Sequence, residues 1–183
     1  MFEIVRIEEN MSNKMYHSVG TEIISSSYLK GVYKHSMARA RIPLEPNDAL
    51  VFGSHFHDMC EYGVEEFENK YSVIPDECSN KRTKLYKEFI ANNENAITKQ
   101  DYRKVGLMYE NLNDNAFYRD LEDNYSSYAE HSFFASKDGL DFRIRPDKYY
   151  SYDSKIVYVV DFKTCQDVTK FKFDVNTYNY DLQ

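Results

Sequence analysis

The spacing of apolar and polar residues changes along this chain from a helical period to an alternating one. Over residues 25–122 apolar side chains stand three and four positions apart, with few breakers over 81–122, while Pro43 and Pro46 separate the first two helices. The serines at 25–27 and the Asn-Asp pair at 47–48 offer side-chain oxygens that can cap the first two helices. The pattern predicts a helical part with two or three further helices over 81–122, preceded by a loose polar arm over residues 1–21.

The pattern becomes strand-like over residues 130–163. Asp138-Gly139 is a strong signal for a tight hairpin turn. The segment after this turn alternates apolar and polar residues, and its apolar members should form the inward face: Leu140, Phe142 and Ile144. We therefore expect an antiparallel three-strand meander at the centre of the fold.

The last strand of this meander ends in charged residues. After a turn near residues 152–154, the segment 155–160 is mostly apolar and rich in β-branched residues, so we expect a buried strand. Side chains two positions apart on a strand point the same way, so Asp161 and Lys163 should emerge together while Phe162 packs behind them. An acid and an amine would then share one small site.

A second acid, Asp147, follows Pro146 at the end of the preceding strand. A divalent cation between Asp147 and Asp161 would compensate the cost of holding their charges in a partly buried place. Carboxylate oxygens are the ligands that Mg²⁺ and Mn²⁺ prefer, so the pattern points to metal-assisted hydrolysis with Lys163 positioning or deprotonating water. Each residue also has a structural interpretation, Asp147 as a turn acid and Lys163 as an ion-pair partner of Asp161.

The combination of Pro146-Asp147 with Asp161-Phe162-Lys163 resembles the signature of the PD-(D/E)XK nuclease superfamily. Four further stretches, in the same order, resemble the exonuclease VIII branch of phage-type recombination exonucleases. These stretches are Ile24–Lys30, Gly53-Ser54-His55-Phe56-His57, Glu130 at the start of a strand, and Thr164-Cys165-Gln166-Asp167. The resemblance covers most of residues 22–183.

The resemblance implies roles for particular residues. The catalytic group would be Asp147, Asp161 and Lys163, and Mg²⁺ (or Mn²⁺ as a substitute) would be held by His57, Glu130, Asp147, Asp161 and the backbone carbonyl of Phe162. Two DNA contacts are also predicted: Arg145, one of several basic residues near the motif, and Gln183, which matches the first residue of the family's Gln-x-x-x-Tyr element. A surface histidine and a plain turn remain alternatives for His57 and Glu130.

The resemblance also implies a fold and an activity. The fold would be α+β, a restriction-endonuclease-like core with a closing helix over 168–183, and C-terminally incomplete because family members continue with at least one further strand. The activity would be 5′-to-3′ digestion of duplex DNA in phage-type recombination, by a ring-shaped homo-oligomer with a single-strand annealing partner. Two alternatives stay open: an endonuclease or repair nuclease on the same core, and a truncated or inactive copy that only binds DNA or a protein.

Composition places limits on these interpretations. The chain has 183 residues, about the length of one domain, which we assign to 22–183. Its net charge of −7 opposes DNA binding, although basic residues gather near the motif and bound cations would reverse the local sign. Its three cysteines lack C-x-x-C spacing, which excludes an iron–sulfur site.

Targeting signals are not evident in the sequence. The longest apolar run is too short to cross a bilayer, and the first residues lack the basic start and apolar core of a secretory signal. We therefore expect no membrane partner and a cytoplasmic location, in a bacterium or a phage-infected host cell.

Overall fold

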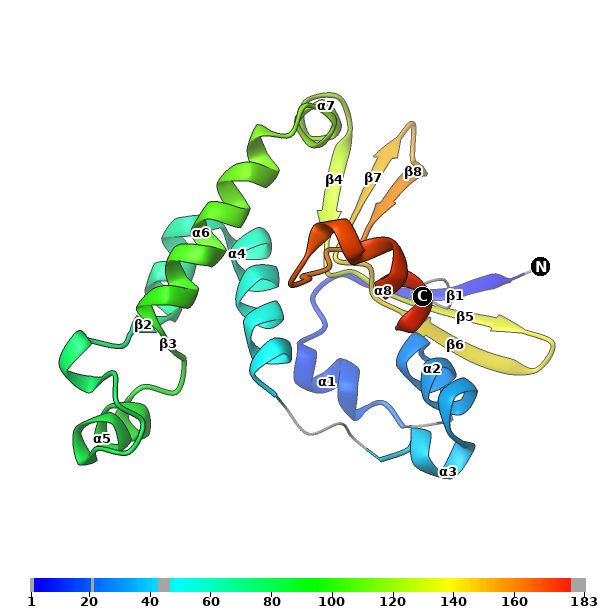
Figure 1. Ribbon diagram of the computed structural model, residues 1–183. Coiled ribbons are helices and arrows are strands. Elements are labelled where there is room, and N and C mark those ends of the chain that lie inside the picture. The colour runs from blue at the N-terminus through cyan, green and yellow to red at the C-terminus, as the bar shows by residue number, and fades with distance from the viewer. Residues whose placement is uncertain (1, 21, 43–46, 179–183) are drawn as a thin grey trace. The chain divides into compact units, whose positions relative to one another are not determined.

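The computed structural model describes residues 2–20, 22–42 and 47–178. Two compact units divide the chain, with boundaries at Glu45/Pro46 and Tyr125/Ser126 (Figure 1). Residues 22–183 contribute to both units, and the first unit also takes in the N-terminal residues. Helices and antiparallel sheets are both present, as expected for the α+β class.

The first unit contains two sheets and several short helices. Its elements are β1 (Glu3–Glu8), α1 (Asn13–Ser18), α2 (Ser26–Lys34), α3 (Met37–Ala40), β4 (Ser126–Ala129), β5 (Ser132–Lys137), β6 (Leu140–Ile144), β7 (Lys148–Tyr152), β8 (Lys155–Val160), the 3₁₀ turn η2 (Val168–Lys170) and α8 (Phe171–Thr177). Ser25 caps α2, as predicted, by accepting a hydrogen bond from a backbone N–H in the first turn. The closing helix is shorter than predicted over its described residues, and 179–183 lie outside them.

The strands form two antiparallel sheets instead of one meander. The orders are β1-β5-β6 and β4-β7-β8, so the chain crosses from one sheet to the other between β4 and β5 and again between β6 and β7. The hairpin turns predicted at Asp138-Gly139 and near 152–154 are confirmed, with positive φ at the central residues of each turn. The predicted three-strand meander is wrong. The chain forms a further strand, β7, between β6 and β8, and β8 pairs with β7. The prediction missed β7 because its run of tyrosines lacks alternation.

The N-terminal residues are ordered elements and not the predicted loose arm. Strand β1 pairs antiparallel with β5, and the two lie side by side in Figure 1. The hydroxyl of Ser12 caps α1 by accepting the backbone N–H of Met15 at 3.2 Å. The prediction failed because the alternation of β1 is weak on its own, and the strand gains its hydrogen bonds only from a partner about 130 positions later in the chain.

Burial in the strands differs from the sequence pattern at two places. Strand β8, predicted to be buried, is an edge strand whose Ile156 and Val159 are 48% and 62% exposed. In β6 the predicted inward residues Leu140 and Ile144 are also about half exposed, whereas Arg143 between them is buried. The covered face of β6 therefore carries a cation, because the N-terminal residues supply acceptors for it.

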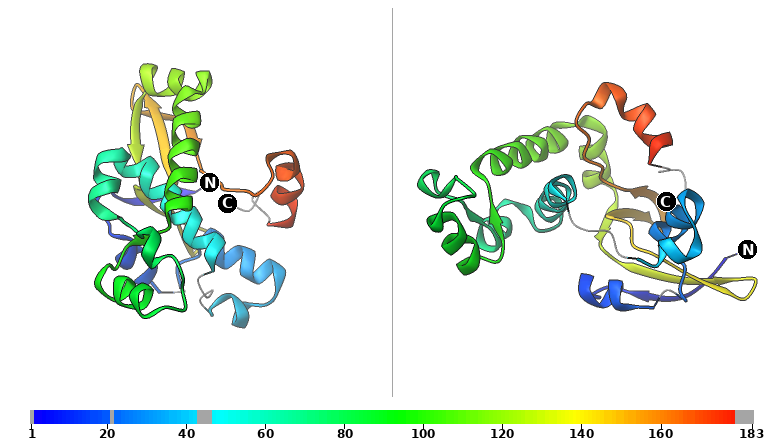
Figure 2. Two further views of the ribbon diagram at one scale, coloured as in Figure 1. Left: turned by 60° about the vertical axis from the view of Figure 1, so that its left-hand side comes forward. Right: turned by 60° about the horizontal axis from the view of Figure 1, so that its bottom comes forward.

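The second unit is mainly helical. It contains α4 (Asp48–Lys70), β2 (Ser72–Val73), the 3₁₀ turn η1 (Asp76–Cys78), α5 (Lys84–Asn92), β3 (Ala96–Ile97), α6 (Lys99–Asp114) and α7 (Ala116–Asn124). Asn47 caps α4, as predicted, and a non-helical Gly63 kinks it. Helix α4 packs against α6 (Figure 2), and the core of the unit includes Met59, Phe67 and Val105.

Among the described residues, no helix combines the length and the apolar character that a bilayer crossing requires.

A buried histidine in α4 makes the second unit sensitive to acid. His55 is 6% exposed, its ring packs edge-on against Tyr71, and its Nδ1 has no hydrogen-bond partner among the described residues. Burial lowers the pKa of His55, and the charges of Asp101 and Asp58 oppose this shift only in part. The folded state therefore favours the neutral imidazole.

We expect acid to destabilise this unit through His55. Because the pKa of His55 is below 6.5 in the folded state, the stability present above about pH 6.5 is lost as the pH falls toward that lowered value. His55→Phe keeps an aromatic ring against Tyr71 and removes the titration, so its melting temperature should fall less between about pH 7.5 and about pH 5.5. Thermal unfolding followed by circular dichroism measures both proteins, and equal falls would contradict the assignment.

Candidate functional site

The candidate site lies where the chain passes between the two sheets of the first unit. Strand β4 continues into β5 through residues 130–131, and β6 continues into β7 through residues 145–147. The two crossings are opposite each other, because the backbone N–H of Glu130 donates to the carbonyl of Asp147 at 3.3 Å. This hydrogen bond holds the backbones of two predicted site acids together.

The third acid reaches the same place from β8. Val160, the last residue of β8, pairs with Lys148, the first residue of β7, so Asp161 and Asp147 each lie one position beyond a paired residue. The backbone N–H of Phe162 donates to Asp147 Oδ2 at 2.5 Å. The carboxylate of Asp147 therefore contacts the peptide group that directly follows Asp161, as the motif spacing predicts.

Lys163 completes this arrangement. Its Nζ forms an ion pair with Asp161 Oδ2 and donates a hydrogen bond to the carbonyl of Phe162 at 3.3 Å. The Phe162 residue is only 9% exposed, whereas the side chains of Asp161 and Lys163 keep 34% and 22% of their surface. The alternation of side chains after β8 thus places the acid and the amine together, within reach of a solute.

Glu130 is held by a cation from the neighbouring crossing. Its backbone adopts a positive φ of 55°, which a residue with a Cβ rarely takes without support from its surroundings. Its Oε2 lies 3.8 Å from Nη1 of Arg145, whose side chain is only 6% exposed. The acid is thereby oriented at the junction of the two sheets.

The surroundings of Arg145, predicted as a DNA contact, favour a structural role. Its guanidinium donates to the hydroxyl of Ser132, to Oδ1 of Asn13 and to the carbonyl of Met11, all at 2.7–2.8 Å, and lies over the ring of Tyr16. A cation enclosed in this way is not presented to a phosphate. The sequence did contain a signal for this role, since Arg143 and Arg145 are two apart on a strand and share a face.

Two predicted site residues are not among the described residues of the first unit. His57 lies on α4, in the other unit, and Gln183 lies outside the described residues. Within the described ranges no three His, Cys, Asp or Glu side chains gather so that they could hold a metal ion. At the sheet junction Glu130 faces Arg145 and Asp161 faces Lys163, so each of these two acids has a cation as its neighbour.

The smaller set of oxygen donors still fits Mg²⁺ in kind. Asp147, Asp161 and the carbonyl of Phe162 are hard oxygen ligands on consecutive or hydrogen-bonded segments. Mg²⁺ is commonly held in proteins by only one or two carboxylates and keeps several waters. These three donors, with Lys163 beside them, have the chemistry of a hydrolytic metal centre.

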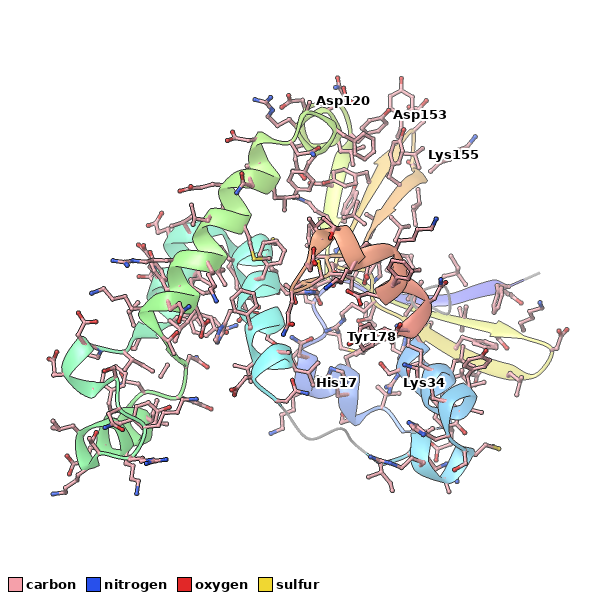
Figure 3. All side chains as sticks on the ribbon, viewed as in Figure 1. His17, Lys34, Asp120, Asp153, Lys155 and Tyr178 are labelled. Carbon is pink, nitrogen blue, oxygen red and sulfur yellow. The ribbon has the colours of Figure 1, made fainter. Side chains whose placement is uncertain are left out.

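The segment after Lys163 returns to the N-terminal part of the same unit. Lys34, at the end of α2, donates through Nζ to the carbonyl of Thr177 at 2.7 Å and lies 5.4 Å from the ring centroid of Tyr178 (Figure 3). Two stretches of the family resemblance, Ile24–Lys30 and the residues after Lys163, therefore belong to one folded unit.

Comparison with known proteins identifies one family. The model of a family described as a PDDEXK-like domain of unknown function (DUF3799) matches residues 22–183. No curated protein and no solved structure shows a significant match to the chain. The match includes all of the acids at the sheet junction and Lys163, and it leaves out β1 and α1.

We expect the bond between Asp147 and Phe162 to stabilise the first unit. Asp147→Ala leaves the Phe162 N–H without this acceptor and should lower the free energy of unfolding by about 1–3 kcal/mol. Asp147→Asn keeps an oxygen that can accept the same N–H and should lose much less. Urea denaturation of the three proteins makes the comparison, and equal losses for Ala and Asn would show that the hydrogen bond is not what matters.

Proposed function

The chain belongs to this PDDEXK-like family, and we propose that it is a metal-dependent deoxyribonuclease hydrolysing phosphodiester bonds of duplex DNA. The observation that carries the proposal is the hydrogen bond from Phe162 N–H to Asp147, directly beside the Asp161–Lys163 ion pair. It brings Asp147 together with an acid and an amine, Asp161 and Lys163, that come later in the sequence, at one end of a sheet. The restriction-endonuclease-like core implied by the resemblance is part of this proposal.

The oxygen donors define the proposed metal centre. Asp147, Asp161 and the Phe162 carbonyl would hold Mg²⁺, with Mn²⁺ as a substitute, and Glu130 and His57 are further ligands implied by the resemblance. A bound Mg²⁺ supplies a more acidic water and neutralises charge that develops on the phosphoryl group. Asp147 also helps to orient the donors, because its carboxylate accepts the backbone N–H of Phe162, the residue whose carbonyl is the proposed backbone ligand.

Lys163 is the proposed group that handles the attacking water. Its ammonium lies between the Asp161 carboxylate and the Phe162 carbonyl, so its position is set by two acceptors on the same short segment. An ammonium held there can donate a hydrogen bond to a water or to a phosphate oxygen of the substrate. Its partial exposure leaves room for that approach.

The finer assignment follows the exonuclease VIII resemblance. We propose 5′-to-3′ digestion of linear duplex DNA in phage-type recombination, by a homo-oligomer that works in the cytoplasm with a single-strand annealing protein. Support for these features comes from the order and spacing of the motifs, of which Asp147 and Asp161-Phe162-Lys163 carry the most weight.

Removing the acid or the amine should abolish nuclease activity. Asp161→Asn and Lys163→Gln should each slow Mg²⁺-dependent degradation of linear duplex DNA by roughly 10²-fold or more, since each removes charge from the reacting centre. Asp153→Asn is the matched control, because Asp153 occupies an exposed turn at the far end of the same hairpin (Figure 3). Release of labelled nucleotides measures the three rates.

Two outcomes would contradict the proposal. An unchanged rate of DNA degradation by Asp161→Asn would contradict the proposed mechanism. DNA binding by the unsubstituted protein without any turnover would favour the binding-only alternative. Folding of each variant is checked by its melting temperature, so that a lost activity is not a lost structure.

Substrate topology separates exonuclease from endonuclease action. An exonuclease needs a DNA end, so linear duplex should be degraded while covalently closed circular duplex of the same sequence remains intact. Gel electrophoresis of both substrates after incubation with Mg²⁺ makes the comparison. Nicking or linearisation of the circle would identify an endonuclease on the same core and overturn the exonuclease assignment.

A further inference from the structure

The residues before the family match are attached to the sheet junction by two buried arginines. Strand β1 pairs with β5, and the segment after it provides the carbonyl of Met11 and the side chain of Asn13 as acceptors for Arg145. Tyr16 lies under both guanidinium groups, 4.3 Å from Arg145 and 4.9 Å from Arg143. This segment therefore belongs to the folded unit although residues 22–183 alone match the family.

The two arginines differ in what else they touch. Among the described residues, the guanidinium of Arg143 donates to the carbonyls of Tyr16 and Val19, at 2.6 and 2.8 Å, so it fastens the N-terminal segment to β6. Arg145 fastens the same segment but also donates to Ser132 and faces Glu130 at 3.8 Å. The guanidinium of Arg143 therefore contacts the N-terminal segment, whereas that of Arg145 joins the segment to the candidate site.

We propose that Arg145 is a positioning residue of the metal centre, through which the N-terminal segment sets the place of Glu130. The inference rests on the proposed function and adds a residue and a segment to it. Glu130 in turn is hydrogen-bonded through its backbone N–H to the carbonyl of Asp147, so a displaced Glu130 moves the Asp147 backbone as well.

The chemistry of the site requires an arginine. The planar guanidinium has five donors in a fixed fork, and here it serves Ser132, Asn13 and Met11 at once while its face covers the ring of Tyr16. A lysine has a single nitrogen at the end of a flexible stem and cannot reach these acceptors together. Lysine therefore keeps the charge beside Glu130 but loses the geometry.

Support of this kind affects metal affinity. Residues that orient the ligands of a metal commonly change its affinity by 10- to 100-fold when they are substituted. Glu130 has a positive φ of 55°, a conformation that persists only where its surroundings impose it. We therefore expect the loss of Arg145 to weaken Mn²⁺ binding as well as to lower the stability of the protein.

The test compares Arg145→Lys with Arg143→Lys as the matched control. Both variants keep a positive charge beside the ring of Tyr16, and both substitutions should lower the melting temperature. Calorimetric titration with Mn²⁺ alone should show roughly 10-fold or more weaker binding for Arg145→Lys and no comparable change for Arg143→Lys. Asn13→Ala, a milder change that removes a single acceptor of Arg145, should weaken Mn²⁺ binding in the same direction.

Each result is decisive. Equal Mn²⁺ affinity for Arg145→Lys and Arg143→Lys would overturn the positioning role, while loss of Mn²⁺ binding by Asp161→Asn would still support the metal centre. Failure of the unsubstituted protein to bind Mn²⁺ would instead overturn the proposed function, and this inference with it.

Discussion

The hydrogen bond from Phe162 N–H to the Asp147 carboxylate is the contact on which the candidate site depends. It connects the crossing between β6 and β7 to the segment that leaves β8, and it joins a carboxylate to a backbone donor, which is stronger than a bond between neutral groups. The carbonyl of the same residue, which belongs to the next peptide unit, accepts from Lys163. One side chain thus holds the peptide group between Asp161 and Phe162, next to the acid and the amine.

The bend between the two sheets explains why acids collect at this place. Residues within a strand pair with a neighbouring strand through their backbone groups, whereas a crossing between two sheets leaves a few residues outside that pairing. Glu130 and Asp147 occupy the two opposite crossings and remain linked by one backbone hydrogen bond. Asp161 lies one residue beyond β8, so all three acids stand where regular pairing stops.

Charge at the junction is balanced locally. Arg145 faces Glu130 and Lys163 faces Asp161, so each of these two acids has a cation beside it. Burying Arg143 and Arg145 under the N-terminal segment takes two positive charges out of the set that could attract DNA in a chain of net charge −7. The proposed catalytic centre would then rely on a bound cation to favour phosphate, and the N-terminal segment becomes a structural part of that centre.

Local sequence determined the helix caps at Ser25 and Asn47, both hairpin turns, and the grouping of Asp161 with Lys163, because each depends on neighbours in the chain. The tertiary structure alone decided the pairing of β1 with β5, the exposure of β8 and the enclosure of Arg145, since each depends on a partner far away in sequence. Apolar composition can indicate a strand, but it does not reveal which face another segment will cover. For that reason the motif was visible in the sequence, whereas the support that holds it was not.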